Sequence, residues 1–324
     1  MQSVARPFAI SLLGDIMLGR LVGERIADGI NQPTEFCWIE PALARFVEDA
    51  DLVVGNLETA VTDADDEHKW PNKAFNFRIS PAAFARAMQC LRINYVSLAN
   101  NHALDFGLRG LTDTAATLDA LKIHYGGVSH SFGSGYSDND EERGIFLRRP
   151  DGVTILLLAA TTHPADFAPA VRVLPPDMDE LVADVERARR QPRGFRGPIV
   201  CSLHWSDNYL AAPTPEMTRL GRRLIDAGAT IVHGHSAHHL LPYELYGDGV
   251  IFYAMGDFVD DYAVSERWRN DLGAVAKVQL DLRTNRVVGV ETRMTRIADM
   301  RVSTLSHRDP DYTRSKRIFT AVRL

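Results

Sequence analysis

Short apolar runs alternate with amphipathic segments along most of the chain, and this alternation constrains the fold more than any other feature. Apolar runs bounded by turn-forming residues are typical of buried strands. They lie at 8–13, 52–54, 95–98, 153–160, 199–203, 230–232 and 250–253. Helices are predicted between them, at 34–50, 80–92, 108–121, 177–190 and 215–227. Strands that alternate with helices predict a layered α/β protein.

The chain shows no internal repeat and no shift in composition that would mark a domain boundary. A single domain over residues 1–324 is therefore predicted. Near the C-terminus, residues 274–282 and 287–294 alternate apolar and polar side chains around Thr284 and Asn285. This pattern predicts a β-hairpin at about 274–294. Residues 129–143 are rich in Gly, Ser and Asp and predict a loop.

Charge and apolar content argue against several classes of partner. The net charge of −6 provides no overall attraction to nucleic acid or to an anionic membrane. No apolar run approaches the roughly 18 residues of a membrane span, and residues 8–13 are too few for the apolar core of a signal peptide. Cys37, Cys90 and Cys201 are an odd number and widely spaced. Their spacing predicts no disulfide and fits a reducing cytoplasm.

Histidines concentrate in the stretch from His233 to His239, which follows the apolar run 230–232. Gly234 is expected to turn the backbone as this strand ends. His235 and His238 lie three residues apart on that turn and can converge on one metal ion. The alternative is a polar loop with surface histidines.

Potential metal donors follow several of the predicted strands. In layered α/β folds, ligands bind at the carboxyl ends of strands, so these donors are expected on one edge. The six candidates are Asp15, Glu58, Asn101, His204, His235 and His238. Mixed nitrogen and oxygen donors in this number exceed what one four-coordinate zinc needs and suit two ions held close together. We expect one or two divalent ions, with manganese, zinc, iron or calcium favoured over copper(I).

Other polar residues near these strand ends are candidates for catalysis or substrate binding. His102 follows a predicted ligand and can move protons, with Asp105 holding its other ring nitrogen. The further candidates are His163, Asp257 and His239 for acid/base chemistry, and Arg20, Arg78 and Trp205 for substrate binding. Each also has a structural interpretation, as a solvated surface arginine or a packed aromatic ring.

The residues around these candidates resemble the poly-γ-glutamate capsule synthesis (CapA) family, a branch of the calcineurin-like metallophosphatase superfamily. The resemblance covers roughly residues 8–262 and rests on GDIMLGR at 14–20, GNLE at 55–58, SLANNHALDFG at 97–107, HW at 204–205, GHSAH at 234–238 and GDF at 256–258. It implies a four-layer α/β/β/α sandwich around a dinuclear metal site. It also implies that the six donors are metal ligands and that His102 is the catalytic histidine.

The chain departs from the superfamily pattern in places. Ordinary metallophosphatases have a histidine two residues after the first aspartate, where this chain has Met17. Their second motif supplies a bridging aspartate, where this chain has Asn56 and Glu58. One metal position therefore has one nitrogen donor fewer. Asp257 adds a carboxylate where the family usually has asparagine, and is a further candidate ligand or acid/base.

The same residues are compatible with three functions. The one we predict is metal-dependent epimerisation or racemisation at the α-carbon of a peptide or amino-acid carboxylate, as in the lasso-peptide epimerase branch, and the other two are alternatives. The second is metal-dependent hydrolysis of a phosphoester or an amide, including poly-γ-glutamate. The third is a non-catalytic component of capsule synthesis. The expected partner is a peptide or small-molecule carboxylate, with oligomeric state left open.

Overall fold

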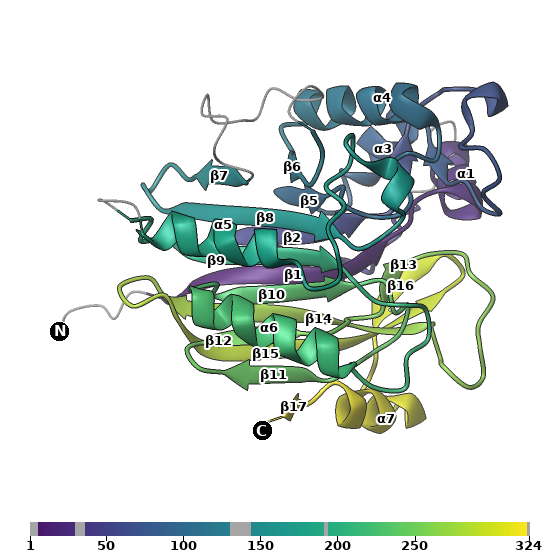
Figure 1. Cartoon of the computed structure of the whole chain (residues 1–324). Helices are drawn as coiled ribbons and strands as arrows, with labels where there is room; N and C mark the ends of the chain where they lie inside the picture. The colour runs from purple at the N-terminus through teal and green to yellow at the C-terminus, as the bar shows by residue number, and fades with distance from the viewer. Residues whose placement is uncertain (1–5, 30–35, 130–143, 191–193, 323–324) are drawn as a thin grey trace.

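Two β-sheets stacked face to face form the centre of the computed structural model, which describes residues 6–29, 36–129, 144–190 and 194–322 (Figure 1). The first sheet contains β1 (Phe8–Ile16), β2 (Leu52–Leu57), β5 (Tyr95–Ser97), β6 (His124–Gly126), β13 (Asp257–Val259), β14 (Leu272–Asp281), β15 (Arg286–Ala298) and β16 (Arg301–Thr304). The second contains β7 (Ile145–Arg148), β8 (Thr154–Thr161), β9 (Ile199–His204), β10 (Ile231–His235), β11 (Tyr243–Tyr246), β12 (Gly249–Phe252) and β17 (Ala321–Val322). The short strands β3 (Ala60–Val61) and β4 (Arg78–Ile79) pair separately.

Each sheet has a parallel centre and antiparallel strands toward an edge. In the first sheet, β1, β2, β5 and β6 are parallel neighbours, while β14, β15 and β16 continue it as an antiparallel edge. In the second, β8, β9, β10 and β12 are parallel, with β7 and β11 antiparallel at either side. Parallel strands need crossover connections, and the helices supply them.

Helices cover the outer face of each sheet. α1 (Arg20–Asp28), α2 (Pro41–Glu48), α3 (Pro81–Ala87) and α4 (Gly107–Ala120) share a buried apolar cluster with the first sheet. α5 (Asp179–Arg190) and α6 (Pro215–Ala227) share another with the second sheet and lie in front of it in Figure 1. A third cluster fills the space between the sheets. The expected four-layer α/β/β/α sandwich is therefore confirmed.

Local sequence signals explain where several helices begin and end. In α6, the Thr214 hydroxyl accepts a hydrogen bond from the Met217 amide, Pro215 occupies the first turn, and Gly228 ends the helix with φ of 115°. The predicted helix at 215–227 matches these bounds. Ser80 caps α3 in the same way, but α3 ends at Ala87 rather than near residue 92.

The helix predicted at 34–50 is shorter in the structure. α2 begins at Pro41, with Glu40 extended at φ −64° and ψ 133°. A residue that precedes proline is driven from the helical region, and proline fits the first helical turn, so Pro41 determines the start. Residue 34 and most of the predicted loop at 129–143 lie outside the described residues.

The C-terminal hairpin is confirmed as β14 and β15, and it is longer than predicted. It pairs with β1 and so extends the first sheet. After it, α7 (Pro310–Ile318) leads to β17, which pairs with β11 in the second sheet. Short 3-10 turns lie at Asp66–His68 and Ala165–Phe167. Within the described residues, no helix is both long enough and apolar enough to cross a membrane.

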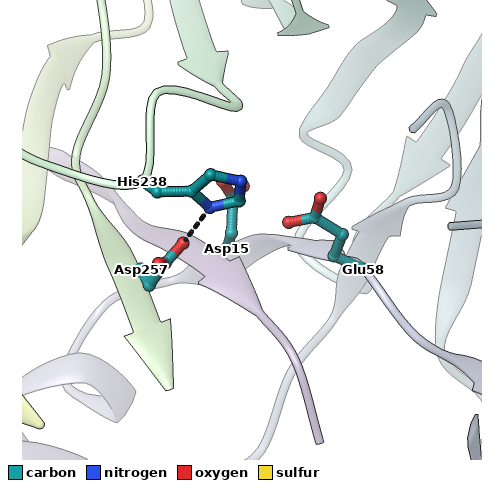
Figure 2. Close-up of side chains that lie close together, drawn as sticks. All are labelled: Asp15, Glu58, His238 and Asp257. Carbon is teal, nitrogen blue, oxygen red and sulfur yellow. Dashed lines mark hydrogen bonds and ion pairs between the residues drawn. The ribbon is translucent and has the colours of Figure 1, made fainter. Parts of the chain in front are cut away.

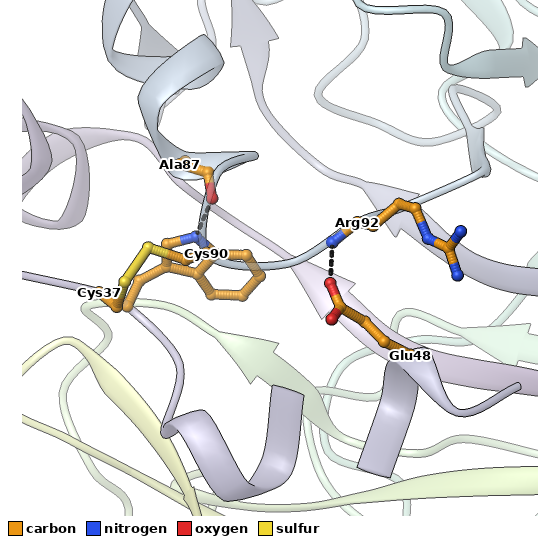
Figure 3. The surroundings of a disulfide bond; sticks show 6 residues. Cys37, Glu48, Ala87, Cys90 and Arg92 are labelled. Atoms are coloured by element: carbon orange, nitrogen blue, oxygen red, sulfur yellow. Dashed lines mark hydrogen bonds between the residues drawn. A yellow bond between two sulfur atoms is a disulfide. The ribbon is translucent and has the colours of Figure 1, made fainter. Parts of the chain in front are cut away.

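The prediction of no disulfide is wrong, because Cys37 and Cys90 are bonded across a sequence separation of 53 residues (Figure 3). Their Cα atoms lie 5.6 Å apart. The adjoining Trp38 is buried and donates its indole N–H to the carbonyl of Ala87, at the end of α3, over 2.9 Å. Such long-range pairing cannot be read from spacing, and it disagrees with the predicted reducing cytoplasm. Cys201 is buried and unpaired.

The expected turn at Gly234 is also wrong. β10 continues through His235, and positive φ angles follow at Ser236 (93°) and His238 (58°). A Cβ atom at Gly234 would lie 2.4 Å from the carbonyl oxygen of Tyr253 and 2.6 Å from Nε1 of Trp205. The glycine is therefore needed for close packing, and the turn comes after it.

Candidate metal centre and its cavity

Strand ends from both sheets bring polar side chains to one edge of the fold. Asp15 lies near the end of β1, opposite Asn56 in β2 and Asp257 in β13. His204 ends β9 and pairs with His235 at the end of β10. The carboxyl ends of parallel strands are where layered α/β proteins bind ligands. This edge is therefore the candidate functional site.

Hydrogen bonds join the two sheets directly beneath the site. Nε2 of the buried His233 lies 2.8 Å from the carbonyl oxygen of Leu13, to which it donates. The Ser236 amide donates to Oδ2 of Asp15 over 3.1 Å. These contacts fix β10 of one sheet against β1 of the other, so residues from both sheets share one rigid site.

Asp15, Glu58, His238 and Asp257 form the centre of the site (Figure 2). One potential ligand atom from each lies within 4.8 Å of the others, and all four residues are buried. Figure 2 shows the Glu58 carboxylate directed toward the His238 imidazole, with His238 hydrogen-bonded to Asp257. We call these four residues the donor cluster.

Several buried polar atoms in and around the donor cluster have no hydrogen-bond partner among the described residues. They are both carboxylate oxygens of Glu58, Oδ2 of Asp257, Oδ1 of Asn101 and Nδ1 of His204. Leaving a buried carboxylate without a partner is costly, and a bound cation would compensate that cost. Carboxylate, amide and imidazole donors suit divalent manganese, zinc or iron. The residues present therefore fit a divalent metal site.

Burial and neighbouring charges shift the pKa values of the cluster in different directions. Burial, reinforced by the charge of Asp15, raises the pKa of Glu58 well above its usual range. Burial also acts to raise the pKa of Asp15, but the hydrogen bond and charge of His235 outweigh it and lower that pKa. Burial opposes protonation of His238, yet Asp257 raises its pKa to about 10. A cation would compete with that proton.

The other predicted ligands surround the donor cluster. His235 has one ring nitrogen 3.0 Å from Oδ1 of Asp15 and the other 3.0 Å from the Ser202 hydroxyl. Nε2 of His204 lies 3.8 Å from Oε1 of Glu58, and burial lowers the pKa of His204 well below its usual range. Asn101 lines the adjoining cavity.

His102 has a fixed orientation beside the donor cluster. Its Nδ1 lies 2.7 Å from Oδ2 of the buried Asp105, and its Nε2 lies 3.9 Å from Oε1 of Glu58. Its ring stacks on Phe77 with centroids 4.1 Å apart. Because Asp105 accepts from Nδ1–H, the neutral imidazole keeps its lone pair on Nε2, toward the cluster.

Lys73 holds the turn that carries His102. Its ammonium group donates to Oδ1 of Asp105 and to the backbone carbonyl of Asn101, and lies 3.1 Å from Nδ1 of His102. Burial lowers the pKa of Lys73, although Asp105 opposes that shift. The lysine thus connects a predicted ligand with the residue that orients the histidine.

A cavity of about 560 Å³ opens over the cluster. It is lined by Arg20, Lys73, Ala74, Phe75, Phe77, Asn101, His102, Asn208, Tyr209, His238, Tyr262 and Ala263. This lining includes the cationic side chains of Arg20 and Lys73, and none of its described residues is acidic. The cavity therefore favours an anionic ligand with some apolar surface.

The remaining predicted site residues lie in different places. Arg20 lines the cavity, whereas Arg78 is exposed, donates to the Ala64 carbonyl and lines a separate pocket. Trp205 is buried in the core of the second sheet and donates to the Tyr253 carbonyl over 3.1 Å. His163 lies beside His204 with ring centroids 5.5 Å apart.

Some residues of the site were not identified from the sequence. Nδ2 of Asn100 donates to Oδ1 of Asn56, and Nδ2 of Asn56 donates to Oδ1 of Asp15, over 3.0 and 2.8 Å. Both asparagines fall inside motifs that also carry predicted ligands, which was a usable signal. Lys73 and Tyr262 lie in loops without such a signal.

Comparison with known proteins finds one matching family and several related sequences. A family described as "Bacterial capsule synthesis protein PGA_cap" matches residues 9–262. The PGA biosynthesis protein CapA of Bacillus subtilis is 30% identical over 255 residues, covering 78% of this chain and 63% of that protein. The capsule biosynthesis protein CapA of Bacillus anthracis is 28% identical over 281 residues, covering 85% of this chain and 64% of that protein.

A probable polyglutamine synthesis accessory protein of Mycobacterium tuberculosis is 30% identical over 310 residues. The match covers 91% of this chain and 79% of that protein. The match to the two Bacillus proteins spans less than two thirds of their length.

Proposed function

This chain belongs to the bacterial capsule synthesis protein family, and we propose that it is a divalent-metal-dependent hydrolase that cleaves an amide bond in an anionic, glutamate-rich peptide or polymer. The relatives named for poly-glutamate synthesis support that class of substrate. The observation that carries the proposal is the position of His102. It is held by Asp105 and faces unpartnered carboxylate oxygens beneath a cavity with cationic walls.

The donor cluster would hold the metal, with Asn101, His204 and His235 close enough to take part. A divalent ion there supplies Lewis-acid polarisation of a carbonyl oxygen and lowers the pKa of water. The oxygen-rich donor set favours manganese or iron as much as zinc. One ion or two remain compatible with this donor set.

His102 supplies the proton transfer in this mechanism. Burial lowers its pKa, so the ring is neutral near pH 7 and can accept a proton at Nε2 from an attacking water. The new C–O bond forms as the amide C–N bond breaks, and the same proton passes to the leaving nitrogen. Asp105 keeps the ring in the required tautomer and stabilises its charged form.

The geometry favours hydrolysis over epimerisation. Exchange of an α-proton with inversion needs two acid/base groups on opposite faces of the carbon. Of the candidates for the second group, Asp257 is buried against His238. His163 packs beside His204 and His239 packs beside Trp268, and both lie outside the cavity lining formed by the described residues. His102 is therefore the side chain to which we assign proton transfer.

Mass spectrometry of a γ-linked glutamate trimer incubated with manganese- or zinc-loaded protein tests the proposal. In ¹⁸O-labelled water, we expect shorter products in which the new carboxylate carries one labelled oxygen. A parallel incubation in D₂O distinguishes epimerisation, which would introduce deuterium at an α-carbon of the uncleaved trimer. An intact, unlabelled trimer in both solvents would reject catalysis and leave an accessory role in polymer synthesis.

A further inference from the structure

Arg20 enters the cavity with only part of its guanidinium group engaged. Its Nε lies 3.2 Å from Oδ2 of Asp261, the one ion pair that Arg20 forms within the described part of the chain. No described residue accepts a hydrogen bond from its two terminal nitrogens. The side chain is 38% exposed and lines the cavity beside His102 and His238. An arginine in this state presents a two-nitrogen edge that matches a carboxylate.

Asp261 fixes the direction in which Arg20 points. Its side chain is 2% exposed, and its Oδ2 accepts a hydrogen bond from the Leu21 amide over 3.0 Å and forms the ion pair with Nε of Arg20. One buried oxygen therefore holds the backbone and the side chain of adjacent residues. Arg20 also has φ of 51°, uncommon for a residue with a side chain. This conformation is maintained by the contacts at the start of α1.

Aromatic rings connect Arg20 with the proposed acid/base residue. The guanidinium carbon lies 5.6 Å from the Phe77 ring centroid and 6.0 Å from that of Phe75. Phe77 stacks in turn on the His102 ring. Phe77 therefore contacts both the guanidinium group and the ring assigned to proton transfer. Cation–π contact with the two rings further restricts the guanidinium.

The other basic side chains of the cavity wall, Lys73 and His238, already have partners. Lys73 donates to Asp105 and to the Asn101 carbonyl. Nδ1 of His238 lies 2.9 Å from Oδ1 of Asp257. Among the described lining residues, Arg20 is thus the strong cationic donor with unused hydrogen-bonding capacity. The acidic donor cluster lies nearby and would repel an anion that had no cation to receive it.

We propose that Arg20, oriented by Asp261, is the subsite that binds a substrate carboxylate next to the amide placed over the donor cluster. Arg20 is the binding residue and Asp261 is a positioning residue. The inference rests on the proposed function for the reaction, but carboxylate binding is measured without turnover. The proposed subsite implies that the substrate is a peptide or polymer with a free carboxylate next to the amide bond that is cleaved.

Calorimetric binding of two probes tests this subsite. The probes are a γ-linked glutamate trimer and its neutral counterpart with amides in place of the free carboxylates, each titrated into metal-free protein to prevent cleavage. We expect Arg20→Gln to weaken binding of the anionic trimer roughly 10- to 100-fold, the range for loss of a charged hydrogen bond. Its binding of the neutral trimer should not change. Arg286→Gln is the matched control, because Arg286 is exposed and its guanidinium group is likewise ion-paired with an aspartate, Asp248.

Asp261→Asn tests the positioning role. It should reduce the preference for the anionic trimer over the neutral one. If Asp261 had only a structural role, the substitution would weaken the binding of both trimers equally. Arg20→Lys keeps the charge without the two-nitrogen edge and should lose part of the preference. Because Arg20 is exposed, Arg20→Lys should fold, and the subsite can still be tested with it if Asp261→Asn does not fold.

Three results would overturn the subsite. One is wild-type protein that prefers the anionic trimer no more than the neutral one. Another is an Arg20→Gln variant that retains the preference. The third is that methyl phosphate competes with the anionic trimer more strongly than acetate does, which would show that Arg20 binds phosphoryl oxygens. Failure of amide cleavage with an intact preference would reject the proposed hydrolysis alone.

Discussion

Nε2 of His102 lies 3.9 Å from Oε1 of Glu58, a buried carboxylate oxygen without a hydrogen-bond partner among the described residues. His102 comes from the turn after β5, and Glu58 follows β2. The two strands are parallel neighbours in the first sheet. The proposed proton-transfer group and a candidate metal donor are therefore fixed side by side by backbone pairing. The following predictions test what that arrangement does.

Replacing His102 by alanine should reduce hydrolysis roughly 10²- to 10⁴-fold, the usual contribution of a positioned acid/base group. Metal content should stay near the wild-type value, because His102 lies outside the donor cluster. Trimer cleavage and elemental analysis of the same samples provide the two measurements. His68→Ala, at an exposed histidine that also contacts an aspartate, is the control. Full activity in His102→Ala would contradict the mechanism.

Glu58→Gln should remove most of the divalent-metal binding. The substitution keeps the size of the side chain but removes a charged donor whose two oxygens accept no hydrogen bond from the described residues. Added manganese or zinc should raise the melting temperature of the wild type, since a ligand that binds only the folded state stabilises it. The variant should show little of that increase. An equal increase in both proteins would exclude Glu58 as a ligand.

The stability of the metal-free protein should depend on pH through Glu58. Because burial raises its pKa in the folded state, its favourable contribution is complete below the unfolded value of about 4.3 and is lost as pH rises toward the folded value. Above about pH 5, the wild type should therefore lose stability relative to Glu58→Gln. Urea unfolding of both proteins in chelator, across a pH series, measures the difference. A constant difference would contradict the raised pKa.

Lys73→Met should impair hydrolysis more than it impairs folding. The ammonium group holds Asp105 and the Asn101 carbonyl, so its loss should loosen the orientation of His102 and shift the acid limb of the pH–rate profile. Lys73→Arg keeps the charge and should restore part of the rate. Lys69→Met, at a neighbouring exposed lysine paired with Asp66, provides the control. An unchanged pH profile in Lys73→Met would limit Lys73 to a structural role.

Loss of the disulfide should destabilise the fold by about 2–4 kcal/mol, because the bond restricts the unfolded chain over a long loop. Cys37→Ser with Cys90→Ser should lower the urea midpoint, and reductant should have no further effect on this double variant. The wild type should respond to reductant by a similar amount. A wild type that is indifferent to reductant would show that the bond does not form in solution.

The layered architecture and most of the site were predictable from the sequence. Strand length, alternation and turn residues are local properties, and the rule that ligands bind at strand ends placed Asp15, Glu58 and His204 on one edge. It was less predictable which residues within each motif would lie in the candidate site. Asp257 joins the donor cluster, while Trp205 of a well-matched motif packs in the core.

What the sequence determined by itself was the order of strands and helices, the family, and the residue types available at each strand end. The tertiary structure alone decided which of them meet. Lys73 reaches Asp105, Asp261 reaches Arg20 and Cys37 reaches Cys90 across separations that carry no periodic signal. Hydrophobic patterning specifies which face of an element is buried, but strand register and loop path determine which distant polar groups come within bonding distance.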